Sequence, residues 1–209
     1  MKHTLRTAVV ATAVLCAALV ATAPAYAGAA PAHAAAPSAR PLDAVKPLDA
    51  AKLAVTRRID LRLATLKRLA ATLGDAKQVN AAHRGTLNGL VGDQTAGLTA
   101  LRAKVGAEAT TAAVKSDAQD MVDDYRVFIL TGPKVRLTAA IDTEEAVLDR
   151  LHDRGVDDAK LQAIRAGLAG KVDTLLAIAP GPDGDAIRAQ VKTVREAART
   201  ARAQLKALA

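Results

Sequence analysis

Between residues 185 and 208, apolar side chains recur at alternating intervals of four and three residues. This spacing places them on one face of an α-helix and is typical of a seam between packed helices. The seam consists of Ile187, Val191, Val194, Ala198, Ala201, Leu205 and Leu208. Further helices are predicted over residues 48–73, 75–105, 108–155 and 157–178. We therefore expect an all-α protein, an elongated antiparallel helical bundle or coiled coil of about five helices.

The composition supports helices and limits what their interior can hold. Apolar residues make up 51% of the chain, with alanine the commonest, whereas aromatic residues make up 1%. Alanine stabilises a helix but fills little volume. We therefore expect thin seams between helices, a shallow core and no deep pocket lined by large side chains. The dispersed β-branched residues argue against a sheet.

Residues 1–27 have the features of a secretory signal peptide. Lys2 and Arg6 precede an apolar run over residues 8–23, and Ala-Tyr-Ala at 25–27 provides a small-x-small cleavage site. Such a segment predicts export. The apolar run is short for an uncleaved anchor across a bilayer core of about 30 Å. We therefore expect a secreted, extracellular protein, in one interpretation associated with the cell wall.

Cleavage after residue 27 would remove the only cysteine, Cys16. Leu15 stands where a lipoprotein signal needs a small residue, so lipidation is not favoured. The exported chain would have no disulfide, and helix packing alone would stabilise it. Residues 28–47 are rich in alanine and proline and predict a disordered spacer, leaving 48–209 as the helical domain.

The aromatic pair Tyr125 and Phe128 lies three residues apart on the apolar stripe of the third predicted helix. This spacing predicts that both rings pack in the core. Gly132 and Pro133 follow, and proline removes a helical hydrogen bond and disfavours helix in the residue before it. We therefore expect a kink near Pro133. The alternative is that the kink opens a small ligand cavity.

The same segment carries a resemblance. The run YRVFILTGPKVRLTAAID resembles an uncharacterised family of secreted, signal-peptide-bearing helical proteins of high-GC Gram-positive bacteria. The resemblance covers residues 54–151 and implies a helical fold and export, with no assigned activity. Its specific residues are Tyr125, Arg126, Val127, Phe128, Pro133 and Lys134.

A row of cations accompanies the seam of the last helix, displaced from it by one residue. The row is Arg188, Lys192, Arg195, Arg199, Arg202 and Lys206. One interpretation pairs it with acids of the third helix, for which Asp117, Asp120, Asp123, Asp124, Glu144, Glu145 and Asp149 are available. The other interpretation has it bind an anionic polymer or lipid surface outside the cell. Nucleic acid is disfavoured, because stacking aromatics are scarce and export places the chain in the wrong compartment.

The second predicted helix contains Gly85, Gly89, Gly92 and Gly97. Small residues at such intervals permit close approach of backbones. In a water-soluble helix they more often indicate local instability, since each glycine costs about 1 kcal/mol relative to alanine. We favour local instability here.

No catalytic or metal-binding pattern is recognisable. His83 and His152 lack the spacing of paired metal ligands, and residues 181–184 read as a turn. We therefore expect no enzyme activity, metal or cofactor. The predicted function is a structural or interaction role in the cell envelope, with an anionic wall polymer or another envelope protein as partner. Alternatives are an extracytoplasmic holdase-type chaperone and an amphipathic bundle that binds lipid surfaces; the oligomeric state is open.

Overall fold

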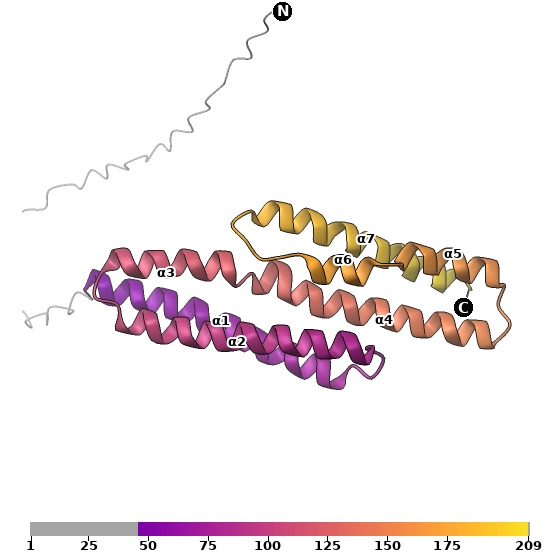
Figure 1. The fold of residues 1–209 in the computed structure, drawn as a ribbon, viewed down its shortest axis with the longest axis horizontal. Helices are drawn as coiled ribbons and strands as arrows, with labels where there is room; N and C mark the ends of the chain where they lie inside the picture. Colours follow the sequence, from indigo (N-terminus) through magenta and orange to yellow (C-terminus); the bar gives the residue numbers. More distant parts are fainter. Residues whose placement is uncertain (1–45, 209) are drawn as a thin grey trace, which may run out of the picture. The chain divides into compact units, whose positions relative to one another are not determined.

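The computed structural model describes residues 46–208, and this part of the chain is all-helical without a strand. The predicted signal peptide and almost all of the predicted spacer lie outside the described residues. The elements in chain order are α1 (Pro47–Asp75), α2 (Ala81–Ala107), α3 (Thr111–Asp124), the π-helix η1 (Val127–Thr131), α4 (Gly132–Asp153), α5 (Asp158–Leu168), α6 (Lys171–Ala177) and α7 (Gly184–Leu208) (Figure 1).

The connection from α1 to α2 differs from the prediction. Helix α1 passes through Gly74 and ends at Asp75, so Gly74 does not terminate it. A turn follows, and α2 begins only after Asn80, whose side chain accepts a hydrogen bond from the backbone N–H of Ala82. Asparagine is a favourable N-cap because its side chain satisfies an otherwise unpaired N–H. The guanidinium of Arg84 donates to backbone carbonyls at the end of α1 and in the turn, which closes this corner.

The interruption of the third predicted helix lies before the Gly-Pro pair. Tyr125 and Arg126 leave helical geometry, with ψ values of 67° and 50°. One turn of π-helix follows, in which the N–H of Gly132 donates to the carbonyl of Val127. Pro133 then occupies the first turn of α4, where a missing N–H costs nothing. The helix therefore breaks at Tyr125–Arg126, and Pro133 starts the next segment.

The fourth predicted helix is divided into α5 and α6. Gly170 separates them with a φ of 65°, a left-handed conformation that side-chain-bearing residues rarely adopt. The last helix agrees with the prediction: α7 spans Gly184–Leu208, against 185–208 expected. Its predicted seam is buried from Ile187 to Leu205, and Leu208 is partly buried.

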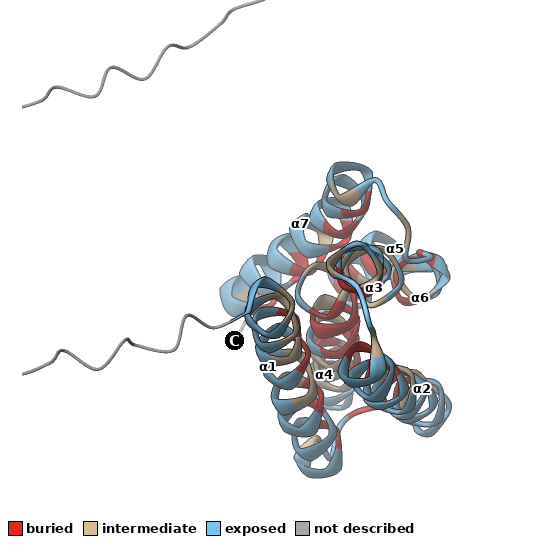
Figure 2. Ribbon diagram, turned by 90° about the vertical axis from the view of Figure 1, so that its left-hand side faces the viewer, coloured by how far each residue is buried: buried red, intermediate tan, exposed pale blue. Residues whose placement is uncertain are grey.

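The buried side chains form two clusters that meet at η1 and the start of α4. One is formed by α1, α2 and α3 with Val127 and Val135, and the other by α4, α5, α6 and α7 with Leu130. Figure 2 shows these buried faces turned inward between the helices. Because η1 contacts both α1 and α7, its residues lie where the two groups of helices come together.

Candidate functional site

The predicted row of cations lies on the exposed face of α7 beside η1 and α4. Five of its six members line two adjoining hollows with volumes of about 330 and 260 Å³, and Arg195 lines both. We call this pair of hollows the basic groove. The η1 and α4 side is formed by Phe128, Ile129, Pro133, Leu137, Ala140 and Glu144, and the α7 side by Arg188, Val191, Lys192, Arg195, Ala198, Arg199 and Arg202. Lys206 is exposed but does not line the groove.

The cations of the row are only weakly matched by acids. Arg188 and Lys192 pair with Asp185 and Glu196 of the same helix at 2.5 and 3.7 Å, and Arg202 approaches Glu144 of α4 at 4.0 Å. Within residues 46–208, Arg195 and Arg199 have no ion pair. Exposed pairs contribute at most about 1 kcal/mol. Five cations and one acid, Glu144, line the basic groove, so its charge is positive on balance.

Pairing of the row with the acids of the third helix, one of the two interpretations, is found only at Glu144. Asp117 and Asp123 lie on α3, which packs on α1 and α2, and they pair with Lys104 and Arg126. Asp149 on α4 pairs with Arg165 of α5. The pairing interpretation therefore holds for Glu144 alone among the acids paired in the described structure.

Glu144 is the acid at the bottom of the basic groove. Its side chain is 7% exposed, and its Oε2 atom has no hydrogen-bond partner among the described residues. Burial raises the pKa of Glu144 to about 6, an effect that Arg202 partly offsets and Glu145 slightly adds to. The groove therefore loses a negative charge when the pH falls through about 6.

The predicted core position of Phe128 is wrong, since its side chain is 53% exposed. The prediction assumed one continuous helix from Tyr125, but the break and the π turn rotate the following residues, so that Val127 and Leu130 are buried instead. The Phe128 ring faces solvent beneath the guanidinium of Arg62, whose carbon lies 5.2 Å from the ring centroid.

A third hollow continues the basic groove past Phe128 toward α1. It has a volume of about 170 Å³, and we call it the arginine pocket. Its cations come from three elements: Arg62 from α1, Arg126 from the break and Arg188 from α7. The other lining residues are Val122, Tyr125, Val127, Phe128 and Ile129.

Tyr125 is partly buried and packs against the core cluster of α1, α2 and α3. Its ring lies against Gly97 of α2, where a Cβ atom would come within 2.6 Å of Tyr125 Cε1. At Gly85, Gly89 and Gly92 a Cβ would meet nothing within 4 Å. Of the four glycines, Gly97 therefore serves close packing, and the other three only reduce helix propensity.

Arg126 and Lys134 on either side of the π turn both bind backbone carbonyls. Arg126 donates to the carbonyls of Gly181 and Pro182 at 2.8 and 2.6 Å. The buried Lys134 Nζ donates to the carbonyls of Leu176 and Ile178 at 2.8 and 2.6 Å. These carbonyls belong to the end of α6 and the loop after it, so the two cations connect the break to that loop.

The two histidines of the helical region each contact one carboxylate. His83 Nδ1 lies 2.9 Å from Asp142 Oδ1, and Asp142 Oδ2 accepts the backbone N–H of Asn80. His152 lies 2.7 Å from Asp158 at the exposed turn after α4. Within the described range, no three His, Cys, Asp or Glu side chains are grouped as metal ligands. The His83–Asp142 contact connects the start of α2 to α4.

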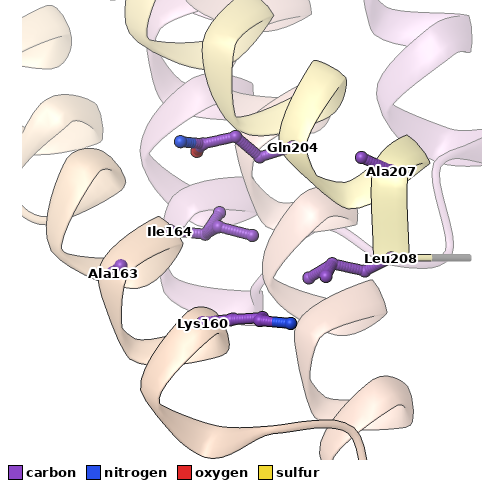
Figure 3. Close-up of a pocket in the computed structure, with 6 residues that line it drawn as sticks. All are labelled: Lys160, Ala163, Ile164, Gln204, Ala207 and Leu208. Carbon is purple, nitrogen blue, oxygen red and sulfur yellow. The ribbon is translucent and has the colours of Figure 1, made fainter.

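An apolar hollow lies between α5 and the end of α7, as Figure 3 shows. Its volume is about 280 Å³. The lining residues are Lys160, Ala163, Ile164, Gln204, Ala207 and Leu208. It contains no acid and one cation, so it differs chemically from the basic groove.

No protein-family model, curated protein or solved structure matches the chain. None of the helices between residues 46 and 208 has the length and apolar character needed to cross a membrane.

Sequence reasoning found the row on α7 but missed the arginine pocket. Arg62 was one of several basic residues on the first helix, and nothing in its spacing set it apart. Its role depends on η1 bringing Phe128 beneath it. The Gly132-Pro133 pair was the only local signal that the helix is irregular here.

Proposed function

We propose that this chain is a secreted, non-enzymatic protein of the cell envelope that binds an anionic wall polymer in the basic groove. The polymer class is one with regularly repeated phosphate groups, such as wall teichoic acid. Export rests on the predicted signal peptide and on the resemblance to a family of secreted helical proteins.

The observation that carries the proposal is that the charges of Arg195 and Arg199 are unpaired among the described residues. They lie at the centre of the groove, and neither has an ion pair within residues 46–208. A protein that used its row of cations only to hold helices together would match them with acids across the interface. Uncompensated cations in a hollow instead concentrate positive potential and attract polyanions.

The regularity of the row favours a polymer over a single small anion. Cations three and four residues apart on one helix recur about every 4.5–6 Å along its axis. The groove between them has apolar walls, including Val191 and Ala198 of α7. Such walls suit the carbon backbone that separates charged groups in a polyol phosphate. Nucleic acid fits less well, because Phe128 is the one aromatic residue that lines the groove.

The experiment is cosedimentation of the purified protein with isolated Gram-positive cell walls over a range of salt concentrations. We expect strong binding that falls as salt rises, because counterions compete with the cations. Walls stripped of teichoic acid should bind much less. The test variant is Arg195→Glu/Arg199→Glu, which we expect to lose most of the binding.

The matched control is Arg57→Glu/Arg68→Glu, which makes the same change of charge on exposed positions of α1 outside the groove. Binding by the control near the level of the unaltered protein would support the groove. Equal losses in both variants would show general charge attraction and overturn the assignment. No binding to walls at any salt concentration would overturn the proposed function itself.

We also infer that the helices form an antiparallel bundle in which the chain bends between Tyr125 and Pro133. The two core clusters on either side of this segment support that inference. The bend would direct η1 toward α7 and form one wall of the groove.

The chaperone alternative is favoured by one observation, the apolar hollow between α5 and α7. A holdase needs exposed apolar surface that can hold an unfolded client. If the protein suppressed aggregation of a denatured client, and Ala163→Asp, an exposed position that lines the hollow, abolished this effect while wall binding persisted, the second function would be supported.

A further inference from the structure

Three arginines from separate parts of the sequence line one hollow together with Phe128. Arg62, Arg126 and Arg188 all line the arginine pocket, and each comes from a different element. Guanidinium groups repel one another, so such a cluster costs free energy unless an anion shares it. The described acids near it are Asp123 and Asp185, which pair with Arg126 and Arg188.

Arg62 has the least compensated charge of the three. Its Nη1 donates to the backbone carbonyl of Arg58 at 3.2 Å, and its Nε is buried without a hydrogen-bond partner in the described structure. Burial lowers the pKa of Arg62, and the charges of Arg58 and Arg126 lower it further. The guanidinium is therefore partly buried over the ring of Phe128, and no carboxylate between residues 46 and 208 pairs with it.

Arg126 is held rigidly at the back of the pocket. Its Nε and Nη2 atoms donate to the carbonyls of Gly181 and Pro182, and Nη2 also lies 3.1 Å from Asp123. Its Nη1 atom is directed toward Gly184, close to the Nη1 atom of Arg188: a Cβ on Gly184 would lie 3.4 and 3.7 Å from these two atoms. The two guanidinium groups therefore approach each other near Gly184, which is not itself part of the pocket lining.

Arg188 forms the outer wall and connects the pocket to the basic groove. Its pair with Asp185 joins two exposed side chains of one helix, and Asp185 is 92% exposed. Such a pair is weak and easily exchanged for another anion. Arg188 can therefore turn toward a ligand without breaking a buried contact.

We propose that the arginine pocket binds a phosphate monoester, with Arg62, Arg126 and Arg188 around its oxygens and Phe128 against the group that carries the phosphate. Guanidinium is the side-chain group best matched to phosphate, because its planar fork donates two parallel hydrogen bonds. A volume of about 170 Å³ accommodates a phosphate and a small attached group but not a folded polymer segment. The proposal goes beyond wall binding, since it requires no polymer.

The test is isothermal titration of the full chain with phenyl phosphate, glycerol phosphate and inorganic phosphate. We expect saturable binding of all three, tightest for phenyl phosphate because its ring can stack on Phe128. Arg62→Gln should weaken all three by about tenfold or more, since it removes a charged donor. Arg57→Gln, exposed on the same helix, is the control and should leave binding unchanged.

Two further variants separate recognition from folding. Arg62→Lys keeps the charge but not the fork, and it should bind more weakly than the unaltered protein and more tightly than Arg62→Gln. Phe128→Ala should reduce the affinity for phenyl phosphate and leave that for inorganic phosphate. Absence of saturable binding by the unaltered protein, or equal affinities in Arg62→Gln and Arg57→Gln, would overturn the proposal.

Phosphate binding and wall binding can be tested independently, because different residues are expected to support them. The Arg195→Glu/Arg199→Glu variant should still bind phosphate monoesters, because neither residue lines the arginine pocket. Arg62→Gln should still sediment with walls. Loss of both activities in either variant would mean that the pocket and the groove form a single polymer site, which would overturn the separate phosphate site.

Discussion

Gly97 of α2 and Tyr125 at the end of α3 are in direct contact, with no room between them for a methyl group. A Cβ built on Gly97 would lie 2.6 Å from Tyr125 Cε1 and 2.9 Å from Cζ. Because Tyr125 is also where the helix breaks, this contact positions the segment that carries Arg126 and Phe128. The shape of the arginine pocket therefore depends on a glycine in another helix.

The substitution Gly97→Ala tests this contact. Overpacking costs about 1–3 kcal/mol, and the gain of about 1 kcal/mol in helix propensity offsets part of it. We expect a net loss of stability in urea unfolding. Gly89→Ala is the control, because its Cβ would meet nothing within 4 Å, and it should raise stability by up to about 1 kcal/mol. Stabilisation by both substitutions would contradict the packing role of Gly97.

Lys134 connects the start of α4 to the end of α6. Its Nζ donates to two carbonyls, those of Leu176 and Ile178, and burial lowers its pKa. Lys134→Met fills a similar volume but leaves both carbonyls without this donor, which should cost about 2–3 kcal/mol in urea unfolding. Arg136→Met, on an exposed position of the same helix, should change stability by less than about 0.5 kcal/mol. Equal effects of the two substitutions would show that other donors serve these carbonyls.

Asp142 fixes the start of α2 to α4. One carboxylate oxygen accepts the backbone N–H of Asn80, and His83 contacts the group at 2.9 Å. Asp142→Ala should cost about 2 kcal/mol in thermal unfolding and accelerate hydrogen exchange at the Asn80 amide. The control is Asp149→Ala, whose side chain is 70% exposed and whose pair with Arg165 should contribute under about 1 kcal/mol. Unchanged exchange at Asn80 would argue that Asp142 has no anchoring role.

The helices were predictable because their apolar spacing is a property of the sequence alone. The seam of α7 is the clearest case, since every predicted member from Ile187 to Leu205 is buried. The ends were less predictable: Gly74 continues α1 in helical geometry, while Gly170 interrupts a helix that the pattern left whole. Whether a glycine ends a helix depends on the contacts that follow it, and those contacts join residues distant in sequence.

The site was predictable only in part, for the same reason. The row on α7 is visible in the sequence because its members belong to one helix. The exposure of Phe128 depends on the π turn. The surroundings of the Arg62 guanidinium depend on which element packs against it. Neither follows from the spacing of residues, so the arginine pocket could be found only from the three-dimensional structure.

Because burial raises the pKa of Glu144, we expect stability and the proposed wall binding to depend on pH. Its pKa is about 6 in the folded protein and 4.5 for the free group. Between these pH values the folded protein therefore keeps Glu144 protonated to a greater extent than the unfolded chain does. Stability should therefore fall as the pH rises from about 4.5 to about 6, by at most about 2 kcal/mol. Glu144→Gln cannot ionise and should be more stable than the unaltered protein at pH 8, by up to about that amount.

The same ionisation reduces the positive charge of the basic groove. We expect wall binding to strengthen as the pH falls below about 6 and expect Glu144→Gln to bind at pH 8 as the unaltered protein does at pH 5. Asp93→Asn, an exposed position on α2 outside the groove, is the control for the loss of one acid. Urea unfolding and cosedimentation at pH 5 and pH 8 measure the two effects.

If the stability difference between Glu144→Gln and the unaltered protein were the same at both pH values, burial of the Glu144 charge would not be its cause. If the binding of Asp93→Asn changed as much as that of Glu144→Gln, net charge alone would control binding, independent of position in the groove.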